Sequence, residues 1–93
     1  MAKTARTSSK ASALVRYRTR MKMEMDILDI GAGGCMLDAR GWSAKPGEQV
    51  SVKLPELAFV PAKVIWIENS RAGIAFDEPL YGPILEHLEA QVG

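Results

Sequence analysis

The sequence predicts a mainly β protein, a small six-stranded antiparallel β-barrel with one C-terminal α-helix. Three observations favour this fold class. Short segments in which apolar and polar residues alternate recur along the chain, and turn signals rich in glycine, proline, asparagine and serine separate them. One amphipathic segment follows the last of these strands. A chain of 93 residues with 47% hydrophobic side chains has room for a single core.

The chain opens with a segment that predicts an arm rather than a strand. "MAKTARTSSKAS" is polar and basic and has no apolar periodicity, so we interpret residues 1–12 as a flexible arm and residues 13–92 as one domain. Residues 1–22 contain seven lysines and arginines and no acidic residue. The net charge of the whole chain is only +1, so its global field favours neither nucleic acid nor an anionic membrane.

Two alternating segments are expected to pair as the first hairpin. "SALVRYRTR" places Arg16, Arg18 and Arg20 at alternate positions, and "MKMEMDI" alternates three methionines with charged residues, which is the period of a half-buried strand. We expect the methionines in the core. The arginines would share one strand face, which either forks phosphate oxygens or is a solvated face paired with Glu24 and Asp26.

Residues 29–34, "DIGAGG", interrupt the apolar pattern with three glycines in four positions. Glycine tolerates positive φ and close backbone approach, so the segment marks a sharp bend or a place where another group lies against the chain. A phosphate-binding loop, a strained turn of an enzyme and a plain hairpin all fit. The residues alone leave these three uses open.

The remaining elements follow in order. "CMLDA" predicts a short strand, "GWSAKPGEQ" a turn-rich link, and "QVSVKL", "AKVIWIEN" and "GIAF" three more strands, with "SRAG" as the tight turn before the last. A helix is expected from about 83 to 91, because Pro83 suits a first turn and apolar residues fall on one side. We expect Trp66 in the core or on a barrel face, and Trp42 in a loop, less buried than Trp66.

The titratable residues do not converge on a catalytic site. His87 is the only histidine, in the expected helix among glutamates, and Cys35 is the only cysteine, which excludes an internal disulfide and indicates a buried structural thiol. No enzyme activity, metal or cofactor is therefore expected. No signal segment or long apolar run is present, so we expect a soluble cytoplasmic protein.

The order of these features resembles the PilZ domain family, receptor domains for the bacterial second messenger cyclic di-GMP. The resemblance covers about residues 6 to 90 and includes "PGEQVSVKLP", "AKVIWIENSRAGIAF" and "PLYGPILEHL". Its most specific part is Asp29-x-Gly31-x-x-Gly34, which is similar to the family's D-x-S-x-x-G motif, with Gly31 in place of the serine. The resemblance implies a six-stranded barrel with a C-terminal helix that binds cyclic di-GMP.

The family's second motif, R-x-x-x-R, has two counterparts in this sequence. Arg6 and Lys10 lie in the arm, where the family carries this motif, with lysine replacing the second arginine, whereas Arg16 and Arg20 match it literally but lie in the first expected strand. The resemblance therefore implies a ligand site drawn from the following residues: Arg6, Lys10, Arg16, Arg20, Asp29, Gly31 and Gly34.

Two functions follow as hypotheses. In the first, a stand-alone domain binds cyclic di-GMP, orders its basic arm and relays the signal to an unidentified protein partner. In the second, which the two substituted motif positions favour, the chain is an adaptor that binds protein only. Neither membrane insertion nor nucleic-acid binding is expected in either case.

Overall fold

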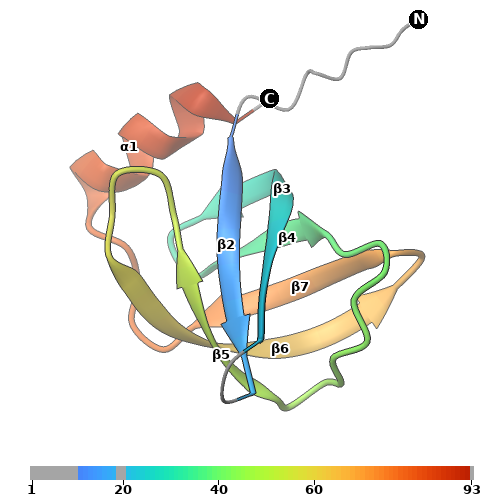
Figure 1. The fold of residues 1–93 in the computed structure, drawn as a ribbon. Helices are drawn as coiled ribbons and strands as arrows, with labels where there is room; N and C mark the ends of the chain where they lie inside the picture. The colour runs from blue at the N-terminus through green and yellow to red at the C-terminus, as the bar shows by residue number, and fades with distance from the viewer. Residues whose placement is uncertain (1–10, 19–20, 93) are drawn as a thin grey trace, which may run out of the picture.

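Six antiparallel strands close into a barrel in the computed structural model, which describes residues 11–18 and 21–92 (Figure 1). The strands are β2 (Ser12–Tyr17), β3 (Met21–Gly31), β4 (Gly34–Asp38), β5 (Gln49–Lys53), β6 (Phe59–Glu68) and β7 (Arg71–Phe76). Their order around the barrel is β2-β3-β4-β7-β6-β5, and β5 pairs with β2 to close it. With helix α1 (Gly82–Gln91) after the last strand, the predicted fold class is confirmed.

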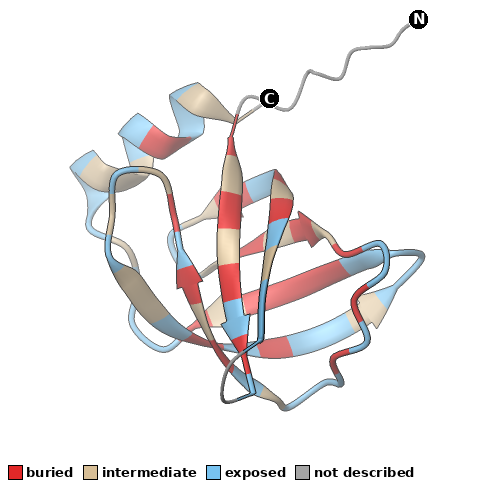
Figure 2. Ribbon diagram, in the orientation of Figure 1, coloured by how far each residue is buried: buried red, intermediate tan, exposed pale blue. Residues whose placement is uncertain are grey.

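Alternation along the strands fills the barrel. Buried and more exposed residues alternate along β2 (Figure 2), and Val50, Val52 and Leu54 of the β5 segment are all buried as their spacing predicts. Apolar side chains from all six strands meet in a single cluster inside the barrel. Fully buried side chains of this size stabilise a fold by roughly 1.5–3 kcal/mol each, so this cluster is the main source of stability.

Helix α1 forms where the sequence predicts it. Proline occupies the first helical turn after Tyr81, which is the N-cap residue, and Leu88 is buried in the core. Ile84, Leu85 and Val92 are partly buried against the same core, so one side of the helix packs on the barrel. The helix runs beside the loop that joins β5 to β6 (Figure 1).

The methionines of β3 are not all in the core. Met25 is buried and Met23 is partly buried, but Met21 is 49% exposed, so the prediction is wrong for Met21. Met21 pairs with Tyr17 at the tip of the β2–β3 hairpin. Its side chain keeps the inward side of the alternation but stands at the rim of the barrel, where water reaches it.

The alternative in which the strand arginines pair with Glu24 and Asp26 is wrong for the two arginines that the structure describes, Arg16 and Arg18. Arg16 lies opposite Lys22, and its guanidinium carbon is 4.3 Å from the centre of the Phe59 ring, a cation–π contact across the outer face. Glu24 accepts a hydrogen bond of 2.9 Å from the hydroxyl of Ser12 instead. The register of the hairpin, which depends on its turn, decides these partners.

Arg18 does not share a strand face with Arg16. Strand β2 ends at Tyr17, and Arg18 has a φ of 52°, so its side chain leaves the alternation. Its Nε lies 3.5 Å from a carboxylate oxygen of Glu48. Arg16 and Arg18 therefore do not form the expected row of guanidinium groups on one strand face. Arg20, the third member of that row, lies outside the described residues.

The expected arm falls almost wholly outside the described residues. Residues 1–10 are not described, and its flexibility stays a prediction. Ala11 is buried and Ser12 already belongs to β2, so the described chain enters the barrel before residue 13.

Candidate functional site

A β-bulge in β3 turns Asp29 to the outside of the barrel. The pairing of β3 with β4 shifts between Ile27 and Asp29, so that Leu28 and Asp29 are both exposed and Ile30 is buried. Strict alternation from the buried Ile27 would have pointed Asp29 into the core. The bulge thus places a carboxylate on the outer face without disturbing the core on either side.

A second bulge does the same for Trp66. The pairing of β6 with β7 shifts between Val64 and Trp66, and the side chains of Ile65 and Trp66 are 56% and 38% exposed. Trp42 is only 6% exposed, so the expected ranking of the two tryptophans is reversed. The bulge is the cause, because its extra residue shifts the alternation by one position and the side chain of Trp66 therefore points out of the barrel.

The Trp66 indole lies across Gly73 on the neighbouring strand. A Cβ atom at Gly73 would overlap indole atoms of Trp66, so only glycine leaves room for the ring to lie flat on the sheet there. The hairpin turn is formed by Asn69 and Ser70, both at positive φ, rather than by the predicted "SRAG". Counting back from that turn sets Trp66 opposite Gly73, a signal that the sequence contained.

Strand register gathers the two bulge residues into one cleft. Asp29 pairs with Met36, Met36 with Gly73, and Gly73 with Trp66, so a row of residues crosses four strands from a carboxylate to an indole. A neighbouring row runs through the following residues: Gly31, Gly34, Ala75 and Lys63. The open cleft over these strands has a volume of about 350 Å³.

The "DIGAGG" segment is a tight hairpin turn. Gly31 pairs with Gly34, which leaves Ala32 and Gly33 as the two turn residues. The carbonyl oxygen of Ala32 accepts the N–H of Leu80 at 2.8 Å, so the turn is tied to the link before α1. Positive φ is found at other glycines but not at the three of this segment, so the strained-turn interpretation is wrong.

Gly34 is required by packing, and this gives a testable difference between two glycines. A Cβ atom at Gly34 would overlap the carbonyl oxygen of Ile74 on β7, whereas one at Gly33 would meet nothing within 4 Å. We expect Gly34→Ala to lower the free energy of unfolding by about 1–3 kcal/mol. Gly33→Ala should change it by less than about 0.5 kcal/mol. Urea unfolding of both variants checks this, and equal losses would contradict the close approach of β4 and β7.

The structure brings three of the proposed ligand residues together and separates a fourth from them. Asp29, Gly31 and Gly34 all line the cleft. Arg16 does not line it, because its partner Lys22 stands seven positions before Asp29 on β3, about 20 Å along a strand. The remaining three proposed residues lie outside the described ones: Arg6, Lys10 and Arg20.

The arm joins the barrel close to the cleft. The carbonyl oxygen of Ala11 accepts the N–H of Ile27 at 3.0 Å, and Ile27 lies two positions before Asp29. The chain that precedes Ala11 is thus attached at the end of β3 that carries the carboxylate. Arg6 and Lys10 are five and one positions before this attachment point, within reach of the cleft by chain length.

Two side chains of the cleft, Asp29 and Cys35, differ in their chemistry. Oδ1 of Asp29 accepts the N–H of Ile30 at 2.9 Å, which orients an exposed carboxylate toward solvent. Burial raises the pKa of the Cys35 thiol to about 12, so the sulfur at the base of the cleft stays protonated and is a poor nucleophile at neutral pH.

No group of three or more histidine, cysteine, aspartate or glutamate residues among the described residues is arranged to hold a metal ion. None of the helices in that part of the chain is long and apolar enough to cross a membrane.

Comparison with known proteins places this barrel in a family. The sequence model of the PilZ domain matches residues 3–92, which is nearly the whole chain. No curated protein and no solved structure matched it. The matched region includes every strand, the closing helix and the cleft with Asp29, Gly31 and Gly34. The chain therefore belongs to the PilZ domain family.

Proposed function

We propose that this domain binds cyclic di-GMP in the cleft between Asp29 and Trp66. PilZ domains are in general binding and effector domains for this dinucleotide rather than enzymes. One observation carries the proposal for this chain. The cleft combines a carboxylate, a strip of backbone without side chains at Gly31 and Gly34, and an exposed indole, beside the attachment of the basic arm.

Asp29 supplies the polar contact for a guanine base or for the arm. A carboxylate accepts two N–H groups that lie side by side, and both the Watson–Crick edge of guanine and the guanidinium of Arg6 present such a pair. The bulge that turns Asp29 outward makes its Oδ2 accessible, since this oxygen accepts no hydrogen bond from the described residues. Either contact would hold the dinucleotide against β3.

Trp66 and the glycines supply the apolar surface. A planar base would lie on the strip of Gly31 and Gly34 with its edge toward the indole, since a flat ring needs a surface free of side chains. Lys63 stands in the same row as this strip and is exposed, so its ammonium group would contact a phosphate. Lys10 and Arg6 of the arm would contact the second phosphate. The arm, held against the ligand in this way, would be the signal that a protein partner recognises.

Calorimetric titration of cyclic di-GMP into the whole chain tests this proposal. We expect heat of binding from the unmodified protein and a dissociation constant about 10- to 150-fold higher for Asp29→Asn, the loss of one hydrogen bond to a charged group. Asp77→Asn is the matched control, because Asp77 is exposed but does not line the cleft. Equal weakening by both substitutions, or none by Asp29→Asn, would contradict the assigned role of Asp29.

The second candidate is an adaptor that binds protein through the same face. The observation in its favour is the exposure of two large adjacent apolar side chains, Ile65 and Trp66, on the outside of the barrel. An adaptor would use them as a contact surface and would give no heat with cyclic di-GMP. The calorimetric titration therefore separates the two candidates.

A further inference from the structure

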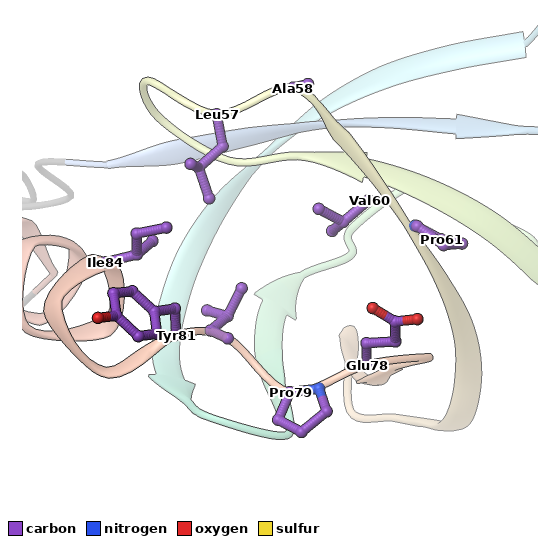
Figure 3. A pocket seen from close by; sticks show the side chains of 9 residues that line it. Leu57, Ala58, Val60, Pro61, Glu78, Pro79, Tyr81 and Ile84 are labelled. Carbon is purple, nitrogen blue, oxygen red and sulfur yellow. The ribbon is translucent and has the colours of Figure 1, made fainter.

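A second hollow surface lies between helix α1 and the loop that joins β5 to β6. Two cavities of about 440 and 420 Å³ adjoin there and share Leu57, Tyr81 and Ile84 in their walls. Figure 3 shows Leu57 of the loop and Tyr81 and Ile84 of the helical segment around one end of the first cavity, with Pro61 and Glu78 around the other. We call this surface the α1 groove.

The α1 groove contains apolar side chains that are exposed or only partly buried. Tyr81 is 71% exposed, and it caps the helix through its backbone only, with no hydrogen bond from its side chain. Leu57 and Ile84 are only partly buried although they adjoin the core. An exposed aromatic ring between two partly covered aliphatic side chains is typical of the anchor pocket of a protein interface.

Every formal charge on the two segments that form the groove is negative. Residues 54–61 and 77–92 contain no lysine or arginine, and their acidic residues are the following: Glu56, Asp77, Glu78, Glu86 and Glu89. Glu56 and Glu78 line the two cavities themselves. The segments also contain His87, whose Nε2 lies 2.7 Å from Oε1 of Glu56. The groove is therefore apolar in its walls and acidic at its rim.

We propose that the α1 groove docks a segment of a partner protein that carries apolar side chains flanked by lysine or arginine. The apolar walls require side chains that fill them, and the acidic rim attracts basic flanks and repels anionic membranes and acidic partners. The chain's own arm is basic, but its first ten residues offer only Met1, Ala2 and Ala5 as apolar groups, too little to fill two cavities. No wall residue is shared with the Asp29–Trp66 cleft, so the proposal stands independently of nucleotide binding.

Selection from a random peptide library displayed on phage, with the whole chain as the bait, tests this inference. The enriched peptides are expected to combine two or more large apolar residues with a net positive charge. Binding of a synthesised enriched peptide should weaken about 30-fold or more in Tyr81→Ala, the loss of an interface anchor. The double variant Glu56→Lys with Glu78→Lys should bind the peptide about tenfold more weakly at low salt. The difference from the unmodified chain should be smaller at high salt.

The control variant is Glu68→Lys, which makes one such glutamate-to-lysine exchange at the far end of β6 and should leave peptide binding unchanged. Tyr81 is exposed, so its truncation leaves the core intact, and circular dichroism checks that each variant is folded. Enriched peptides without basic residues, or binding that survives both groove variants, would overturn the proposal. Self-association that Tyr81→Ala abolishes would assign the groove to a second copy instead, and tenfold tighter peptide binding after deletion of residues 1–10 would assign it to the arm.

Discussion

Replacement of Trp42 by alanine is expected to lower the free energy of unfolding by about 3–5 kcal/mol, as for other buried large aromatic side chains. Trp42 is almost fully buried although it lies in the loop between β4 and β5. Its ring meets that of Tyr17 edge to face, with centroids 5.4 Å apart and planes inclined by 75°. Removing it would leave a cavity against the core, and urea unfolding measures the loss.

Two further substitutions make this prediction specific. Trp66→Ala should cost only about 1–2 kcal/mol, because part of that indole is already in water. Trp42→Phe should cost clearly less than Trp42→Ala, since it keeps an aromatic ring and removes an indole N–H that is buried without a hydrogen bond among the described residues. A larger loss for Trp66→Ala than for Trp42→Ala would mean that the bulge in β6 is misplaced.

The second large effect concerns the two substituted motif positions. Lys10→Arg adds a charge-assisted fork of about 1.5–3 kcal/mol, and Gly31→Ser adds a hydroxyl hydrogen bond of about 0.5–1.5 kcal/mol. Serine fits at position 31, because a Cβ atom there meets nothing within 4 Å and φ is not positive. If the two gains are independent, the double variant binds cyclic di-GMP about 30- to 2000-fold more tightly than the unmodified chain, as measured by calorimetry.

Matched controls separate this gain from a general effect of charge or hydroxyl content. Gly33→Ser adds the same hydroxyl one residue before Gly34, at a position with equal space that does not line the cleft. Lys45→Arg makes the same exchange in the exposed loop before β5. Neither should tighten binding. A folded double variant that gives no heat at millimolar ligand would exclude a weakened sensor and leave the protein-binding adaptor.

The barrel was predictable because its strands obey simple alternation. Val50, Val52 and Leu54 are apolar at every second position and are all buried, and the first turn of the helix contains the proline that suits it. These features depend on neighbours in the sequence only. Once the inward-facing residues of each strand are known, the residues that form the core are known as well.

The residues that line the candidate site were predictable only in part, because the cleft depends on strand register. Asp29, Gly31 and Gly34 were identified through a family motif, and they do line one cleft. Trp66 was missed as a member because the turn that sets its register was predicted at "SRAG" instead of at Asn69 and Ser70. The run "VIWI" is apolar at every position and does not by itself reveal which residue is extra. The proposed phosphate contact of Lys63 was not predicted either, because its row is defined by pairing from β3 through β4 and β7 to β6.

Amide NMR spectra of the labelled whole chain, recorded while cyclic di-GMP is added, test the central claim most directly. The two indole N–H signals serve as internal probes, because Trp66 lines the cleft and Trp42 is buried away from it. We expect the Trp66 indole signal and the amides from Asp29 to Gly34 to shift with a common saturation curve, while the Trp42 indole signal stays in place. Signals of the cleft that remain unchanged at millimolar ligand, or shifts confined to the α1 groove, would contradict the account.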